Sequence, residues 1–461
     1  MMLCTRVEAR DFRALFARCL AGRPRGPAPP VVVRFREGTR AVASTTTDGV
    51  TLTHTATAEE GDEWVVLPGS VLGDVSGNTD EGVRLDRQSK LRGVLHVPGG
   101  RTPQTLAVGL IIPGKQHERP ATPDLLPVTP KFLVALHECG CTTAREPGRF
   151  ALTRVQIQGR AGRVVATDGK AALLCEGFTF PFAEDVLVPA VPVFGSKPLI
   201  PIRDARVGRT ETHLVVAVGP WAVWLPVDAR GRYPDVAALI SRQPTTVVEV
   251  DPGDAAELIN VLPGLPSHRD ENRPITIDAA DAVTIRGRGE SVDNTQEVIL
   301  ARSRVHGPAF HVALDRRLLT RALALGCHAW KLTPGKPFSA EGAGVTLVAA
   351  PLDPTLIVPP RIDAMKCPTE TPVTPAEHPA PITQRRSDMP PSDTNGHTPS
   401  RGDPPDPLLV AEELREALAG AAVTAARLVT ILKVGRKEKK VLSSILANLR
   451  QLGLDAGGPQ Q

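Results

Sequence analysis

The sequence predicts an α+β protein built from three repeated domains of helices packed on antiparallel sheets, followed by a disordered linker and a helical C-terminal extension. Three observations lead to this expectation. One passage occurs twice, as RFREGTRAVASTTTDGVTLT at residues 34–53 and as QIQGRAGRVVATDGKAALL at residues 156–174. Helix and strand signals recur in one order, in units of about 120 residues. The composition then changes after residue 354.

Each copy of the doubled passage contains an alternating strand, a short turn around glycine, a second strand that ends in Thr-Asp-Gly, and a third strand. The two triplets begin at Thr47 and Thr167, 120 residues apart. Self-similarity at such a spacing indicates domains repeated within one chain.

The first unit, residues 1–123, opens with an amphipathic helix over residues 7–20. Phe12 and Leu15 lie on its apolar side, and arginines lie on the other side. Strands follow to residue 66 and from 82 to 112, and residues 68–75 form at most a short second helix.

The second unit, residues 124–243, starts a helix at Thr129-Pro130 that covers residues 131–139. Strands occupy residues 150–175 and 206–227. The stretch 186–202 contains four prolines, which exclude a regular helix.

The third unit, residues 244–354, has a strand over 246–250 and a helix that starts at Asp251-Pro252 and ends near residue 262. Strands cover 275–302 and 309–312, a second helix covers 316–325, and two strands follow. This unit lacks Thr-Asp-Gly, so its membership of the repeat rests on order and length.

Residues 355–405 are rich in proline, threonine and serine, which predicts a disordered linker. Residues 406–455 carry leucines and alanines three and four apart, typical of a helical hairpin or a short coiled coil. Basic residues from Lys433 to Lys440 flank Gly435. They form either a solvated turn or an appended contact to nucleic acid or a partner.

The composition narrows the function classes. Apolar residues make up 41% of the chain but aromatic residues only 3%, so Val, Leu and Ala must fill the cores. The net charge of +4 permits an anionic partner without demanding one. The seven cysteines include no CxxC and indicate reduced thiols. The charged N-terminal segment lacks a signal-peptide core, and no apolar stretch is long enough for a membrane span, so we expect a cytoplasmic protein that binds no membrane.

Several short segments carry a family resemblance. They are VVATDGKAAL at residues 164–173, RFALTRV at 149–155, GRYPD at 231–235, VAAPL at 348–352 and GRP at 22–24. In this order they resemble the bacterial sliding clamp, the beta subunit of DNA polymerase III. The resemblance covers about residues 1–354 and implies three clamp-type domains with helices lining a pore.

A pore that slides on DNA must attract phosphates without reading bases, and basic residues on helix faces do this. The resemblance implies DNA contacts by Arg10, Arg13, Arg18, Arg23, Arg25, Lys131, Arg149, Arg317 and Arg321. The alternative is that each is simply the solvated side of an amphipathic helix.

The family also has a groove between its second and third domains that takes a short linear motif from polymerases and repair proteins. Matched by motif, its positions here are Leu152, Thr167, Gly169, Lys170, Ala171, Ala172, Pro234, Ala238, Leu239, Val348, Ala350, Pro351 and Leu352. The family's usual His-Arg-Leu is replaced by Lys170-Ala171-Ala172, and its usual methionine by Ala350. These smaller linings imply a wider, shallower pocket or, alternatively, a vestigial one.

We therefore expect a DNA sliding clamp-like processivity factor and not an enzyme, because no catalytic or metal-binding motif is present and no cofactor is implied. The expected partners are duplex DNA, DNA polymerase III subunits, a clamp loader and a second copy arranged head to tail. The alternative is a divergent clamp paralogue that serves as a protein-interaction scaffold without encircling DNA. An enzyme on an unrelated β-rich fold is a third, weaker interpretation.

Overall fold

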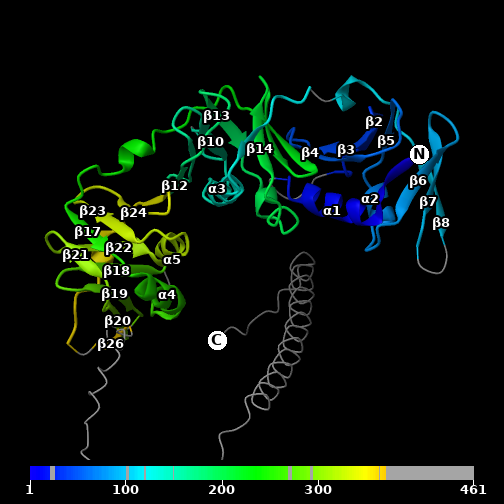
Figure 1. Cartoon of the computed structure of the whole chain (residues 1–461). Helices are drawn as coiled ribbons and strands as arrows, with labels where there is room; N and C mark the ends of the chain where they lie inside the picture. The colour runs from blue at the N-terminus through cyan, green and yellow to red at the C-terminus, as the bar shows by residue number, and fades with distance from the viewer. Residues whose placement is uncertain are drawn as a thin grey trace, which may run out of the picture. The chain divides into compact units, whose positions relative to one another are not determined.

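The computed structural model describes residues 1–20, 26–99, 103–118, 121–148, 150–267, 272–290, 294–362 and 364–369. Within these residues helices pack on antiparallel sheets (Figure 1). Arg23, Arg25 and Arg149 lie outside the described residues, as do most of the predicted linker and the whole predicted helical extension.

The first third of the chain begins with a well-capped helix. Strand β1 (Met2–Thr5) leads into α1 (Arg6–Ala17), where Thr5 and Glu8 form a capping box. Phe12 and Leu15 are buried, as the periodicity predicts. The helix ends three residues earlier than predicted, with Arg18 as its C-cap. The following elements are β2 (Val31–Arg36), β3 (Thr39–Thr45), β4 (Thr51–Thr57), β5 (Glu63–Leu67), α2 (Val71–Val75), β6 (Gly82–Arg87), β7 (Arg92–Val97), β8 (Gln104–Gly109) and the 3₁₀ turn η1 (Lys115–His117).

The second third starts with β9 (Leu126–Val128) and α3 (Lys131–Gly140), so the helix start predicted at Thr129-Pro130 is confirmed. The remaining elements are β10 (Arg154–Gln158), β11 (Arg163–Thr167), β12 (Ala171–Glu176), β13 (Asp185–Pro189), η2 (Pro192–Gly195), β14 (Ala205–Arg209), β15 (His213–Val218), β16 (Trp221–Pro226) and η3 (Ala237–Leu239).

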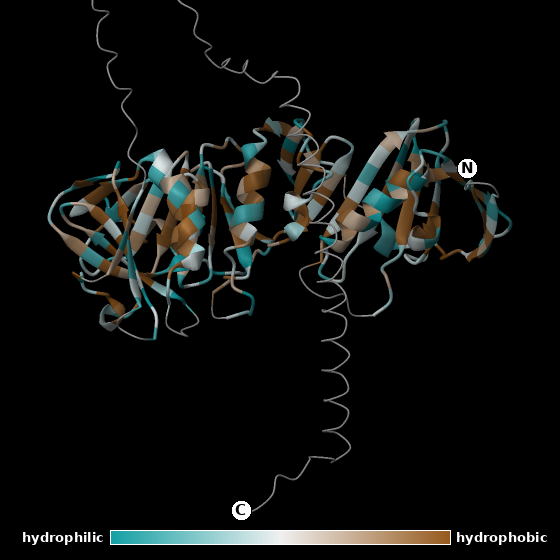
Figure 2. Cartoon of the chain, turned by 90° about the horizontal axis from the view of Figure 1, so that it is seen from below, coloured by the Kyte–Doolittle hydropathy of each residue, from teal (hydrophilic) through white to brown (hydrophobic). Residues whose placement is uncertain are grey.

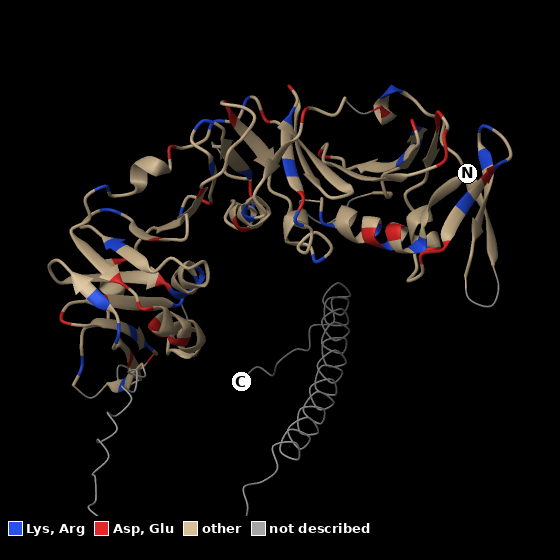
Figure 3. Ribbon diagram, viewed as in Figure 1, with Lys and Arg blue, Asp and Glu red and all other residues tan. Residues whose placement is uncertain are grey.

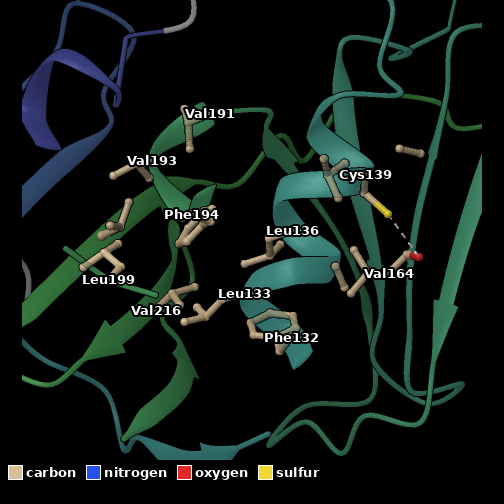
Figure 4. Close-up of a cluster of buried hydrophobic side chains, with 14 of the residues drawn as sticks. Phe132, Leu133, Leu136, Cys139, Val164, Val191, Val193, Phe194, Leu199 and Val216 are labelled. Carbon is tan, nitrogen blue, oxygen red and sulfur yellow. Dashed lines mark hydrogen bonds between the residues drawn. The ribbon is translucent and has the colours of Figure 1, made fainter. Parts of the chain in front are cut away.

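A 3₁₀ turn replaces the second helix of this part, which confirms that the prolines of 186–202 exclude a regular helix. Figure 4 shows Val193 and Phe194 of η2 beside Leu133 and Leu136 of α3, and all four are buried. The approach is close, because a Cβ atom on Gly195 would collide with the ring of His137. The 3₁₀ turn η2, and not a helix, thus covers this part of the core.

The last third contains β17 (Thr246–Glu249) and α4 (Pro252–Val261), which begins at the N-cap Asp251 as predicted. It continues with η4 (Leu262–Gly264), β18 (Pro274–Ala279), β19 (Val283–Arg288), β20 (Thr295–Leu300), β21 (Arg304–His306), β22 (Phe310–Asp315), α5 (Arg316–Ala324), β23 (Ala329–Leu332), β24 (Phe338–Gly342), β25 (Val345–Ala349), η5 (Pro354–Leu356) and β26 (Met365–Pro368).

One strand order recurs three times. In each third, four strands form the same order: β5-β2-β3-β4, then β13-β10-β11-β12, then β22-β18-β19-β20. A second order also recurs: β1-β6-β7-β8, then β9-β14-β15-β16, then β17-β23-β24-β25. The third unit therefore has the topology of the other two, although it lacks the Thr-Asp-Gly triplet.

The strand at the end of each order, here called the outer strand, joins one third to the next. Outer strand β4 pairs antiparallel with outer strand β16, and β12 pairs in the same way with β25. The joints create continuous sheets of eight and nine strands. Outer strands β8 and β20 remain at the two ends of this series.

The cores are built from aliphatic side chains, as the composition predicts. Figure 2 shows apolar and polar residues interspersed along the strands and helices. Fully buried residues include Leu52, Ile157 and Leu214, with Phe12, Phe132 and Trp330 as the few large aromatic members. Such burial removes apolar surface from water and is the main stabilising contribution.

The predicted disordered linker is wrong for its first residues. Val358 is 5% exposed, and its backbone N–H donates to Thr276 Oγ1 at 2.8 Å. Strand β26 pairs in parallel with β20. Composition misled the prediction because the few apolar and hydroxyl residues here find partners far back in the chain. The rest of the linker and the extension at 406–455 stay predictions.

Candidate functional site

Arg10 and Arg13 lie on the exposed side of α1, and Arg18 is its exposed C-cap. Arg10 donates from Nε to Asp11 Oδ1 and from Nη1 to Asn78 Oδ1, each at 2.9 Å. Arg13 and Arg18 are exposed and have no ion pair within the described residues. Figure 3 shows acidic residues interspersed with the basic ones along α1. The helix therefore offers a few available cations rather than a uniform basic face.

The basic residues of α3 and α5 differ in availability. Lys131 is exposed at the first turn of α3. Arg317 is held by Asp315, its Nη2 lying 2.7 Å from Asp315 Oδ2. Arg321 donates from Nη2 to the backbone oxygen of Glu138 and, at 3.0 Å, to Glu138 Oε2 on α3. Both residues therefore have an acidic partner in the chain, but the Arg317 side chain is 65% exposed, whereas that of Arg321 is 23% exposed.

Helix α4 carries no lysine or arginine. Its sequence is PGDAAELINV, with Asp254 buried and Glu257 2.6 Å from Arg302 Nη2. Predicted DNA-contacting residues therefore lie on α1, α3 and α5, one helix in each third of the chain, and none lies on α4.

The second candidate site is organised by a rigid turn at Thr167–Gly169. Thr167 Oγ1 donates to the Ala171 backbone oxygen at 2.7 Å and accepts from Gly169 N. Asp168 Oδ1 accepts from Lys170 N and Ala171 N. Gly169 adopts φ +91°, a left-handed conformation that glycine tolerates without strain. The triplet is therefore required by the turn itself.

The structure brings the predicted pocket segments together at the β12–β25 joint. Ala172 lies opposite Val348 in the sheet, and Ala350 N donates to the Lys170 backbone oxygen at 2.8 Å. Ala172 and Val348 also share a buried apolar cluster with Val236, which follows the GRYPD segment. An ideal Cβ on Gly169 would lie 3.7 Å from Leu152 Cδ1, so Leu152 is a neighbour as well.

Tyr233 fixes the segment that closes this cluster. Its hydroxyl accepts from Thr167 N at 3.1 Å and donates to the Arg154 backbone oxygen at 3.4 Å. Burial raises the pKa of Tyr233 well above its ordinary value, so the hydroxyl stays protonated and keeps both roles.

The predicted pocket residues divide into a floor and a rim. The floor is buried and consists of Thr167, Ala171, Ala172 and Val348. Half-buried positions are Leu152, Pro234 and Leu352. The exposed rim consists of Gly169, Lys170, Ala238, Leu239, Ala350 and Pro351. Leu239 is 46% exposed, so an apolar side chain remains available to a partner.

An apolar pocket that the sequence did not predict adjoins this rim at Pro351 and Leu352. Its volume is about 470 Å³. It is lined by Phe310, Val312, Leu332, Phe338 and Ile357, among others. These residues come from β22, β23, β24 and the C-cap of η5, and no motif links them in sequence. The volume is in the range of small-molecule and peptide side-chain sites.

Within the described ranges, no helix is long and apolar enough to cross a membrane, and no cluster of three or more His, Cys, Asp or Glu is arranged to hold a metal ion.

Thrice-repeated strand orders joined edge to edge, with helices packed against the sheets, define a DNA-clamp fold. Comparison with solved structures shows which clamps the chain is similar to in fold. The DNA polymerase III subunit beta from Pseudomonas aeruginosa matches with TM-score 0.60 at 16% identity, covering 77% of this chain and 100% of that one. The beta chain from Streptococcus pneumoniae matches with TM-score 0.59 at 15% identity, covering 75% and 98%. That from Borrelia burgdorferi matches with TM-score 0.58 at 11% identity, covering 75% and 96%.

The chain thus has the fold of the bacterial DNA polymerase III beta subunit sliding clamps, and the resemblance found in the sequence is confirmed as a likeness of fold. No family model matches the sequence, and no curated protein matches it.

Proposed function

We propose that this chain is a clamp-like processivity factor with three domains, at residues 1–123, 124–243 and 244–354. Two copies arranged head to tail encircle duplex DNA and tether DNA polymerase III subunits during replication, after placement by a clamp loader in the cytoplasm. The role is non-enzymatic. The observation that carries the proposal is the repeated joint between outer strands, β4 with β16 and β12 with β25.

DNA contact is assigned to those predicted cations that have no ion pair among the residues the structure describes. Arg13, Arg18 and Lys131 are exposed, whereas Arg10, Arg317 and Arg321 are held by polar neighbours. Exposed cations attract phosphates irrespective of base sequence, which suits a ring that slides.

Partner binding is assigned to the rim beside Leu239 and to the adjoining pocket at Pro351 and Leu352. An extended peptide lying across this surface places one apolar side chain against the rim and a second in the pocket. Small side chains at Ala172 and Ala350 leave room for a bulky residue.

Retention on circular DNA tests encirclement. The full-length chain, with a clamp loader and ATP, is expected to stay on nicked circular plasmid through gel filtration and to be released when the plasmid is linearised. A chain that behaves alike on circles and linear fragments contradicts the proposal and favours the scaffold alternative.

Peptide binding tests the rim. Leu239→Asp is expected to weaken binding of a fluorescent polymerase-derived peptide at least about tenfold in an anisotropy titration, because the peptide loses an apolar contact and meets a charge. Val134→Asp is the matched control, because Val134 is 58% exposed on α3 and lies outside the rim. Equal effects of the two substitutions contradict the assignment.

A further inference from the structure

Two outer strands, β8 and β20, are not joined to another outer strand of the described chain, and their edges differ. β8 has β7 as its only strand neighbour among the described residues. β20, at the other end, is covered by β26 of the same chain. The internal joints are antiparallel, but β26 runs parallel to β20. The covering strand is therefore not another copy of the repeat.

Strand β26 is fastened by Thr369, the residue that follows it. Thr369 N donates to the Ile299 backbone oxygen at 2.9 Å. Its Oγ1 donates to Asp254 Oδ1 at 2.6 Å and accepts from Ala301 N at 3.0 Å. Asp254 is fully buried, so the hydroxyl completes a buried polar cluster rather than a surface contact.

The chain before β26 lies against the polar side of the same sheet. Val358 N donates to Thr276 Oγ1, and Arg361 N donates to Glu297 Oε1 at 3.3 Å. Glu297 is itself buried and paired with Arg286 at 2.9 Å. Residues 354–362 and 364–369, here called the strap, are thus held at several separated points.

Pro368 limits further strand pairing at the edge of β26 that faces away from β20. Because alternate amides of a strand face the same neighbour, the bond from Thr369 N directs the amides of positions 366 and 368 away from β20. Proline at 368 has no N–H to offer in that direction. The strap therefore replaces the β20 edge with one that cannot fully pair with a further strand, a known defence against unwanted edge association.

The free edge of β8 has the features of the missing partner for β20. Leu110 N donates to the Leu91 backbone oxygen, so the alternation of an antiparallel ladder directs the amides of Thr105, Ala107 and Gly109 away from β7. β8 and β20 each have six residues, and the two internal joints pair four and five residue pairs. A third joint of this type needs β8 from a second copy.

We propose that the strap is an intramolecular cap that competes with β8 of a second copy for the edge of β20. The ring of the proposed function, on which this inference rests, closes only in chains whose β26 has left β20. Release of the strap thereby controls the assembly of two copies.

The test is a deletion of residues 364–369 within the full-length chain, with self-association measured by sedimentation without DNA. The expected result is association at least about tenfold tighter than in the wild-type chain. Deletion of residues 380–385 leaves the strap intact and is expected to change nothing. Loss of Thr369 is expected to lower the thermal midpoint, so a single cooperative unfolding transition above the assay temperature verifies that the deletion variant folds.

In the background lacking 364–369, Ala107→Pro removes an outward amide of β8 and is expected to restore wild-type association, whereas Ala107→Val keeps it tight. Unchanged association after the strap deletion overturns the inference, as does tight association that Ala107→Pro leaves intact. A wild-type chain that already associates as tightly as the variant overturns it too. If the deletion variant associates as expected but is not retained on nicked circles, the proposed function fails and the cap stands.

Discussion

The guanidinium of Arg321 links α5 to α3 through Glu138, with the two side chains 23% and 26% exposed. Because the contact is half-buried, Arg321→Ala is expected to lower the free energy of unfolding by about 1 kcal/mol. DNA affinity should change little, since this charge is already neutralised. Arg13 is exposed, so Arg13→Ala should leave the free energy of unfolding nearly unchanged and should weaken DNA binding. Denaturant unfolding and DNA titrations of the two variants measure these effects. Equal loss of DNA affinity in both variants contradicts this division.

Asp254 makes the stability of the chain depend on pH. Burial by itself would raise its pKa, but hydrogen bonds from Thr369, Ser303 and Arg302 N, with the charge of Arg302, outweigh it and hold the pKa below the ordinary 3.8. The folded chain thus binds fewer protons here than the unfolded chain. Stability from this group is present above pH 3.8 and is lost as the pH falls through the lower folded pKa.

Asp254→Asn is therefore expected to lower the thermal midpoint at pH 7 and to flatten its decline below about pH 4. Thermal unfolding of both chains from pH 7 to pH 3 measures this. A variant whose midpoint falls as steeply as that of the wild-type chain shows that other carboxylates cause the acid sensitivity.

At the scale of elements, the start of α1 depends on one glutamate with two roles. Glu8 Oε2 accepts from Thr5 N at 2.7 Å, which closes the capping box, and from Arg40 Nη2 at 2.6 Å. Arg40 is 1% exposed, so loss of Glu8 leaves a buried charge without this partner. Glu8→Ala is expected to cost about 3 kcal/mol in urea unfolding.

Thr5→Ala is the comparison, because it removes only the cap and should cost about 1 kcal/mol. Similar costs for the two variants would mean that the pairing with Arg40 adds nothing to the stability of α1.

The sequence predicted where helices begin and where none can form, because the residues responsible lie at those positions in the chain. The start of α3 follows Thr129-Pro130, and the absence of a helix at 186–202 follows from proline chemistry. Strand β26 could not be predicted, because Thr369 reaches Asp254 across 115 residues of sequence. A Pro/Thr/Ser-rich composition conceals such a partner.

The candidate site likewise has a part that the sequence predicted and a part that it did not. Pocket positions such as Ala172 and Val348 were located through motifs, and the structure places them side by side. The pocket lined by Phe310, Leu332 and Phe338 had no motif, because single residues of three separate strands, β22, β23 and β24, assemble it. The ion pairs of Arg317 and Arg321 were also hidden, since a sequence shows the charge of an arginine but not its partner.

For the whole molecule, the proposed function requires an attraction to DNA that is delocalised and independent of base sequence. A net charge of +4 over 461 residues cannot provide it uniformly. The proposed function assigns the attraction to those predicted contacts that are exposed and have no ion pair among the described residues, namely Arg13, Arg18 and Lys131. Salt dependence separates these from the paired cations, because each phosphate contact releases counterions.

The triple variant Arg13→Ala, Arg18→Ala, Lys131→Ala is expected to reduce the slope of log K against log salt for short duplex DNA by about 3, since each lost contact removes about 0.9. The matched control is Arg10→Ala, Arg317→Ala, Arg321→Ala, which has the same change in net charge but removes cations that already have polar partners. Its slope should change by less than half as much. Equal changes in the two variants would show that net charge alone governs binding, and a slope that varies with base sequence would exclude a sliding contact.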